Sequence, residues 1–149
     1  MSYEMPSPAV GFTSPATEFT PIAPARVYDS RIAAYAPNNG VMARNTNRIV
    51  PVKDGRDASG AVIAANVVPD GAVAVAINVT IASPTGPNFL SVVPGDAASF
   101  TTSTINWPGG FDAANGAIVK VDASRQLKVF CGDQAGSTHV IIDVTGYYR

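Results

Sequence analysis

Alternation between bulky and small residues is the clearest pattern in this chain. Across residues 72–81 the odd positions are bulky and apolar and the even positions are small or polar: Val73, Val75, Ile77, Val79 and Ile81 against Ala72, Ala74, Ala76, Asn78 and Thr80. A period of two is typical of a β-strand, whose successive side chains point to opposite faces. The turn sequence SPTGPN follows, and then the apolar run FLSVV, which ends at Pro94-Gly95. The pattern predicts a strand, a turn and a second strand.

Similar short runs recur from residue 25 to the C-terminus. The predicted strands cover residues 25–30, 48–52, 72–82, 89–93, 103–106, 117–122, 127–131 and 139–148. Turn-forming sequences such as Pro69-Asp70-Gly71 and Asn115-Gly116 separate them. A helix over residues 58–65 is possible but weakly indicated, because this stretch contains a glycine and two adjacent β-branched residues. The chain is therefore predicted to be all-β, an antiparallel β-sandwich or barrel-like sandwich.

Residues 1–24 differ in composition from the rest of the chain. They include five of the 12 prolines, which disfavour a helix and favour extended conformations. Aromatic residues such as Tyr3, Phe12 and Phe19 make the segment more apolar than a solvated linker. We therefore expect an extended N-terminal arm over 1–24 and one β-sandwich domain over 25–149. The arm is a flexible tail, a lead-in packed on its own domain, or a contact with a neighbouring subunit through these aromatic residues.

Charged residues are scarce in this sequence. They make up 14% of the 149 residues and give a net charge of −1, whereas globular domains carry about 25% charged residues. The ten Lys and Arg residues are scattered, so we expect no nucleic-acid partner, because phosphate backbones are bound by clustered cations. Low surface charge is typical of a subunit packed against other subunits, and equally of a GC-rich genome that favours alanine and valine codons.

Several residue types that could carry chemistry occur only once, or lack the spacing that a catalytic or metal site requires. Cys131 shares the alternation of Leu127 and Val129, so we expect a buried, inert thiol with no disulfide. His139 is the only histidine, and no Gly-x-Ser-x-Gly sequence supplies a nucleophile for it. No run of acidic residues has the spacing of a calcium loop. We therefore expect no cofactor, no metal site and no enzymatic activity.

Two aspartates lie within predicted strands between apolar neighbours, Asp29 in RVYDSR and Asp143 in VIIDVTG. One hypothesis is a pair of carboxylates that hydrolyse a glycosidic bond. The other is a structural role as buried polar groups, because a buried carboxylate must be paired or hydrogen-bonded. Arg26 and Arg31 supply partners at close spacing, which favours the structural role for all four residues.

A glycine-rich loop carries two exposed-type aromatic residues, Trp107 and Phe111, on either side of Pro108-Gly109-Gly110. Such residues fold back to close one end of a sandwich, form a subunit contact, or stack on a sugar ring. The loops over 31–47 and 106–116 are irregular, and loops of this kind are where a rigid β scaffold usually makes its contacts.

The N-terminal sequence MSYEMPSPAVGFTSP lacks the basic and apolar regions of a secretory signal. No apolar run approaches the roughly 20 residues that a membrane span requires. We expect a protein made in, and first released into, a cytoplasm, with no membrane insertion.

Four pieces of the chain, in order, carry a family likeness: PIAPARVYDSR, VPDGAVAVAINVTIASPTGPNFLSVVPG, TSTINWPGGFDAANGAIVKV and VFCGDQAGSTHVIIDVTGYY. Together they span about Pro21 to Tyr148, and they resemble a β domain found, often in tandem, in secreted and cell-envelope proteins of actinobacteria. In that family the first piece usually reads Arg-Val-Leu/Tyr-Asp-Thr/Ser-Arg and the last ends Asp-Val-x-Gly-Tyr-Phe/Tyr. The resemblance implies a β fold and a non-catalytic accessory role.

This chain departs from the family in having no signal peptide, no attached catalytic domain and a single copy of the module. These departures lead us to expect a virion protein of an actinobacteriophage, which is made in the host cytoplasm and leaves by lysis. The first hypothesis is a capsid decoration or minor capsid protein that binds the major capsid protein or another virion protein. By analogy with other decoration proteins we expect a homo-oligomer, such as a trimer. The alternative is a tail or surface adhesin that binds host-envelope glycan.

Overall fold

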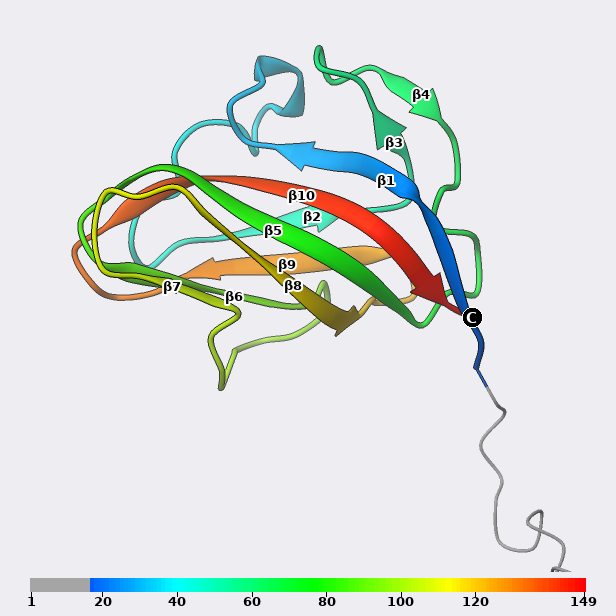
Figure 1. Ribbon diagram of the computed structural model, residues 1–149. Coiled ribbons are helices and arrows are strands. Elements are labelled where there is room, and N and C mark those ends of the chain that lie inside the picture. Colours follow the sequence, from blue (N-terminus) through cyan, green and yellow to red (C-terminus); the bar gives the residue numbers. More distant parts are fainter. Residues whose placement is uncertain (1–16) are drawn as a thin grey trace, which may run out of the picture.

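The computed structural model describes residues 17–149, and its regular secondary structure is almost entirely β-strand (Figure 1). Its elements are β1 (Phe19–Asp29), η1 (Ala33–Tyr35), β2 (Asn47–Pro51), β3 (Gly55–Arg56), β4 (Val62–Ala64), β5 (Ala74–Thr85), β6 (Asn88–Pro94), β7 (Ile105–Trp107), β8 (Ala113–Lys120), β9 (Gln126–Cys131) and β10 (Ser137–Tyr148). Sheet 1 has the order β1-β10-β5-β8, sheet 2 has the order β2-β9-β6-β7, and β3 and β4 form a separate hairpin. The pairings are antiparallel. The two sheets pack face to face, which confirms the predicted all-β sandwich.

The alternating run identified in the sequence forms the centre of the core. Val75, Ile77, Val79 and Ile81 of β5 are buried between the sheets, where they pack with inward residues of β6, β9 and β10. Burying each of these side chains contributes about 1.5–3 kcal/mol. This energy fixes which face of β5 points inward, because a shift of one residue would expose the whole set. Val73 precedes the first residue of β5 and is exposed, so the buried set begins one alternation later than predicted.

The predicted arm over residues 1–24 is wrong at its C-terminal boundary. β1 begins at Phe19, which pairs with Tyr148, and Pro21 pairs with Gly146. Prolines are compatible with this pairing because β1 is an edge strand, whose outward N–H groups need no partner. The rest of the predicted arm, including the proposed interface residues Tyr3 and Phe12, lies outside the described residues.

Three further expectations differ from the structure. The possible helix over 58–65 is instead part of the β3–β4 hairpin, as its β-branched residues favour. The predicted turn at Asn115-Gly116 lies in the middle of β8, where Gly116 pairs with Asn78. Much of the predicted loop over 106–116 is therefore strand. The loop over 31–47 is irregular as predicted, apart from η1 and an isolated bridge between Met42 and Thr138.

Candidate functional site

A groove lies between β1 and the β3–β4 hairpin. It has a volume of about 710 Å³ and apolar walls that include Ile22, Ile63 and Val67. Its polar lining residues are Arg26, Arg56 and Asp143. The groove therefore contains one of the two aspartates that the sequence singles out, together with its arginine.

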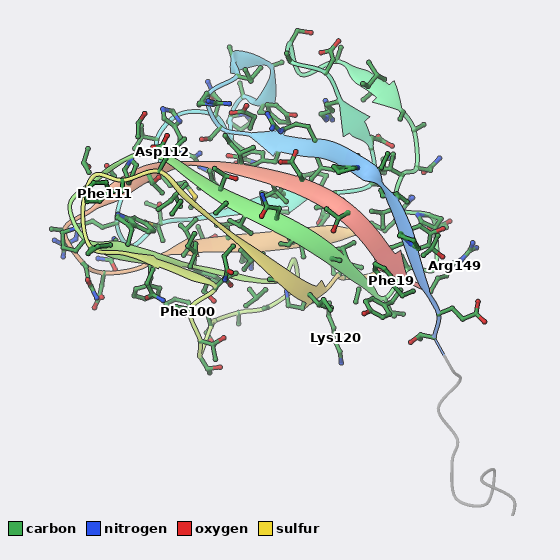
Figure 2. All side chains as sticks on the ribbon, viewed as in Figure 1. Phe19, Phe100, Phe111, Asp112, Lys120 and Arg149 are labelled. Atoms are coloured by element: carbon green, nitrogen blue, oxygen red, sulfur yellow. The ribbon has the colours of Figure 1, made fainter. Side chains whose placement is uncertain are left out.

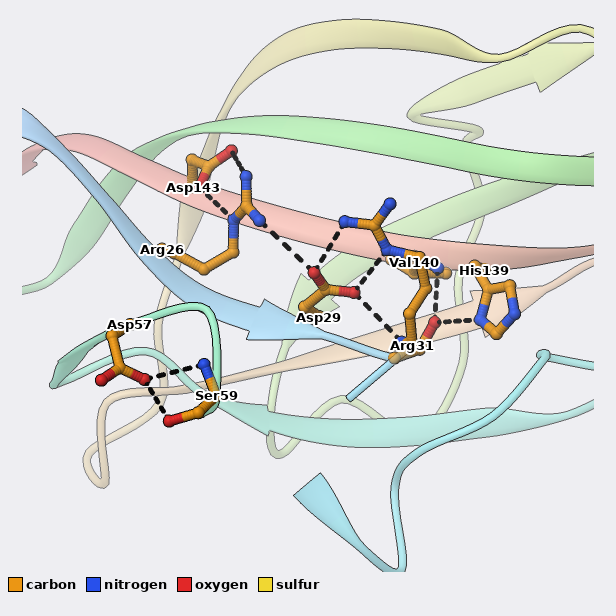
Figure 3. A network of polar contacts seen from close by, with 9 residues as sticks. Arg26, Asp29, Arg31, Asp57, Ser59, His139, Val140 and Asp143 are labelled. Atoms are coloured by element: carbon orange, nitrogen blue, oxygen red, sulfur yellow. Dashed lines mark hydrogen bonds and ion pairs between the residues drawn. The ribbon is translucent and has the colours of Figure 1, made fainter. Parts of the chain in front are cut away.

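Arg26 connects both aspartates (Figure 3). Its Nε donates a hydrogen bond of 2.7 Å to Oδ1 of Asp143, and Nη1 donates one of 3.3 Å to Oδ2 of Asp29. The hydrogen bond and charge of Asp143 raise the pKa of Arg26 above its ordinary value. The guanidinium is thus held in its charged form between two carboxylates on neighbouring strands of sheet 1.

Asp29 is held on both oxygens by Arg31 as well. Arg31 donates from Nε to Oδ1 at 2.9 Å, from Nη2 to Oδ2 at 2.9 Å, and from its backbone N–H to Oδ1 at 3.0 Å. Burial alone would raise the pKa of Asp29, but these hydrogen bonds and the charges of Arg31 and Arg26 outweigh it, so the pKa lies below its ordinary value. A carboxyl group in this state is a poor general acid, because that role requires a raised pKa.

The geometry therefore does not resemble a pair of hydrolytic carboxylates. Asp143 lines the groove, whereas Asp29 is only 4% exposed and its oxygens are occupied by arginines. The arrangement ties β1 to β10 and to the start of the following loop. The prediction that all four residues are buried is wrong for Arg31, whose side chain is 48% exposed. Only the donor atoms of Arg31 reach back to Asp29. Arg26 and Asp143 are partly exposed.

Sequence reasoning missed a second polar contact at the end of β1. Ser30 is buried, its Oγ lies 2.9 Å from Nδ1 of His139, and it accepts a hydrogen bond of 2.8 Å from the backbone N–H of Val140 (Figure 3). The partners are more than 100 positions apart in the chain, so no local motif could have indicated them. A hydroxyl this deeply buried cannot reach a substrate, and the contact joins β1 to β10.

The aromatic residues proposed for contacts have three different environments. Trp107 is 3% exposed and belongs to the core, so its prediction as an interface residue is wrong. The reason is that β7, in which it lies, pairs with β6 and turns the indole inward. Phe111 is 73% exposed and lies at the end of the sandwich opposite Phe19 and Arg149 (Figure 2). Phe19 is 45% exposed, with its ring centroid 5.0 Å from that of Tyr148.

The predicted burial of Cys131 is confirmed. Burial raises the pKa of its thiol to about 11. Asn88 lies beside it and donates its side-chain N–H groups to the carbonyls of Gly132, Gln134 and Gly136 at 2.8–3.1 Å. Both Cys131 and Asn88 are thus buried in a packed, hydrogen-bonded part of the sandwich.

Residues 17–149 contain no group of three or more His, Cys, Asp or Glu side chains placed to hold a metal ion. In the same part of the chain no helix is long and apolar enough to cross a membrane. No protein-family model matches the chain, and no curated protein matches its sequence.

Proposed function

We propose that this protein is a non-catalytic virion structural protein, a capsid decoration or minor capsid protein that attaches to the shell of a bacteriophage. Its partner is the major capsid protein or another virion protein. The resemblance to cell-envelope β domains of actinobacteria supplies the biological setting. The support from the structure is a surface suited to attachment.

The outer face of sheet 1 is the observation that carries the proposal. On β5 the residues between the buried positions point away from the core, and their partners on β8 are largely exposed. Most of these side chains are small, and they pair across the two strands as Ala76 with Ile118, Asn78 with Gly116, and Thr80 with Ala114. Small side chains on adjacent strands leave a shallow surface that another protein can approach closely.

Charge is scarce on the β5–β8 half of this face, where Lys120 at the end of β8 is the only charged residue of the two strands. On the β1–β10 half, the charged residues Arg26, Asp29, Arg31 and Asp143 are paired with one another. Interface centres are depleted of charged residues, because each charge buried there loses its hydration. The β5–β8 half of the outer face of sheet 1 has this composition, whereas a surface meant for solvent ordinarily carries more charge.

The alternative function, an adhesin for envelope glycan, loses its main aromatic residue. A sugar platform needs an exposed ring, and the burial of Trp107 removes it from that role. Phe111 alone remains exposed on the loop. Attachment to a protein shell is therefore the better supported of the two functions.

The test is co-sedimentation of the purified protein with undecorated phage shells. Thr80→Arg places a bulky charge in the middle of the outer face of sheet 1, and we expect it to weaken binding at least about tenfold. The matched control is Ile49→Arg, which places the same charge on an exposed apolar residue of β2 in sheet 2. We expect the control to bind like the wild type.

Two outcomes would contradict the proposal. If the wild type does not sediment with shells, the protein is not a decoration protein. Equal weakening by both variants would mean that binding is not centred on sheet 1. Retention of the wild type on isolated host cell wall, without binding to shells, would instead support the adhesin.

A further inference from the structure

An apolar groove lies at the end of sheet 1 where the described chain begins. It has a volume of about 300 Å³ and is lined by Thr17, Val73, Ala74, Ile118, Lys120 and Tyr148. Ile118 is 64% exposed and Val73 is 47% exposed. Phe19 lies beside Tyr148 at the groove's edge and is half-exposed as well. Three of the large exposed hydrophobic residues therefore meet at one place, which is typical of a surface that binds a partner.

The open edge of the sheet borders the same groove. β8 is the last strand in the order of sheet 1, and Ile118 and Lys120 both belong to it. Within the described residues no strand pairs with the outer edge of β8. An unpaired edge of eight residues without proline is able to accept an added strand.

The chain itself supplies a segment with matching chemistry. Sixteen residues precede the first described one, Thr17, and they include the apolar side chains of Val10 and Phe12. In an extended segment these two side chains lie on the same face, because they are two positions apart. Glu4 is the only charged residue of the sixteen. Lys120 on the groove takes part in none of the ion pairs among residues 17–149, so the charges are complementary.

The direction of β1 favours a second copy as the source of the segment. Glu18 and Arg149 exchange two backbone hydrogen bonds of 3.1 Å, which pins the start of β1 to the end of β10. Because the pairing is antiparallel, Thr17 lies at the rim of the sandwich, next to the C-terminal end of β10. Figure 2 shows Phe19 and Arg149 together at this rim. Val10 precedes Thr17 by seven positions, so it can lie up to about 24 Å from the rim and reach a neighbouring copy.

We infer that this groove receives the N-terminal segment of a second copy of the chain, with Val10 and Phe12 packed against Val73 and Ile118. The exchange of these segments holds a homo-oligomer together. The inference goes beyond the proposed function, since it concerns contacts between copies of this chain and stands whether or not the protein binds a shell.

The test uses two full-length variants that damage opposite partners of the contact. Val10→Asp/Phe12→Asp spoils the segment and leaves the groove intact, and Ile118→Asp spoils the groove and leaves the segment intact. The molar mass of each is measured by size-exclusion chromatography with light scattering over a wide range of concentration. We expect an oligomeric wild type, with self-association at least about tenfold weaker in each variant. The control, Ile63→Asp on exposed β4, should behave like the wild type.

Mixing the two damaged variants separates exchange between copies from folding back within one copy. The intact segment of Ile118→Asp can enter the intact groove of the other variant, so we expect the mixture to form a complex that neither variant forms alone. Thermal unfolding should show that both variants remain folded, because Ile118 is exposed and residues 10 and 12 precede the sandwich. A monomeric wild type at every concentration, or no complex in the mixture, would overturn the inference.

Discussion

Arg26 and Asp143 lie 117 positions apart in the chain and form a hydrogen-bonded ion pair with an Nε–Oδ1 distance of 2.7 Å. They are directly opposite each other in the pairing of β1 with β10, and irregularities in the register lie on both sides of Arg26. The edge strand thus has a side-chain ion pair at the point where its backbone pairing is irregular. Asp29, which shares Arg26, extends this contact into the loop after β1.

Asp29→Asn should destabilise the protein. Asp29 is buried, and its charge is compensated by Arg31 and Arg26. Breaking a fully buried ion pair costs 3–5 kcal/mol, but both arginines here are partly exposed and can be rehydrated, so we expect a loss of about 2 kcal/mol in the free energy of unfolding. Urea denaturation at pH 7 measures it. Asp133→Asn, at an exposed position, should change stability by less than about 0.5 kcal/mol, and an equal loss in both variants would contradict the prediction.

The contribution of Asp29 should depend on pH in a defined direction. Its pKa is lower in the folded protein than its ordinary value, so the ionised form is the one that folding stabilises. The contribution is fully present above the unfolded pKa, about 3.9, and is lost as the pH falls through the lower folded pKa. The stability difference between wild type and Asp29→Asn should therefore be constant from pH 7 to about 5 and shrink below about 4. A difference that grows on acidification would mean that the carboxylate is not stabilised by its arginines.

Cys131 should be unreactive in the folded protein. Its thiol is buried and its pKa is about 11, so the thiolate fraction at pH 8 is about a thousandth even before access is considered. A coloured disulfide reagent should label no thiol in buffer and one per chain in denaturant. Rapid labelling of the native protein would show that the β9 end of the sandwich opens.

Local periodicity predicted the strands well because burial acts on every second residue. The alternation of β5 is visible in the sequence, since Val75 to Ile81 must all face the core. Environments that depend on distant partners could not be predicted in the same way. Phe19 belongs to a strand only because residues 146–148 pair beside it, and the prolines around it suggested otherwise. Trp107 lies in a glycine-rich sequence that suggested an exposed contact loop, whereas its burial follows from the pairing of β7 with β6.

In the candidate site too, contacts between residues close in the sequence were predictable, whereas contacts between distant residues were not. Arg31 follows Asp29 by two positions, so their contact was predictable from spacing. The contact of Ser30 with His139 was not, because the two residues meet only through the pairing of β1 with β10. The groove at Val73 and Ile118 also arises from pairing, since the two residues belong to segments that are far apart in the sequence.

Asn88→Ala should destabilise the connection between β9 and β10. The buried amide of Asn88 donates to three backbone carbonyls of that connection, and its removal leaves acceptors without donors at a cost of about 2–3 kcal/mol. Hydrogen exchange should show faster exchange of the backbone amides that the connection protects, including that of Gly136, which donates to Pro87. Asn106→Ala, whose amide makes one exposed bond to Ser103, is the control and should leave these rates unchanged. Equal effects would contradict the assignment of Asn88 as the residue that holds this loop.

Gly146→Ala should displace Phe19 from the end of sheet 1. A Cβ at position 146 would overlap the ring of Phe19 and lie 2.9 Å from the carbonyl oxygen of Thr20, so both the ring and the start of β1 must shift. We expect a loss of about 1–2 kcal/mol in unfolding free energy, typical of overpacking. Gly109→Ala is the matched control, because its Cβ would meet no atom within 4 Å.

Nuclear magnetic resonance should locate the effect of Gly146→Ala. Phe19 and Tyr148 have ring centroids 5.0 Å apart, so movement of Phe19 changes the ring-proton shifts of Tyr148, which lines the proposed groove. Gly109→Ala should leave these shifts unchanged. If Gly146→Ala also leaves them unchanged and costs no stability, then Phe19 does not pack on this glycine in solution. In that case Phe19 would not border the groove, and the docking of Val10 and Phe12 would need to be retested at the edge of β8 alone.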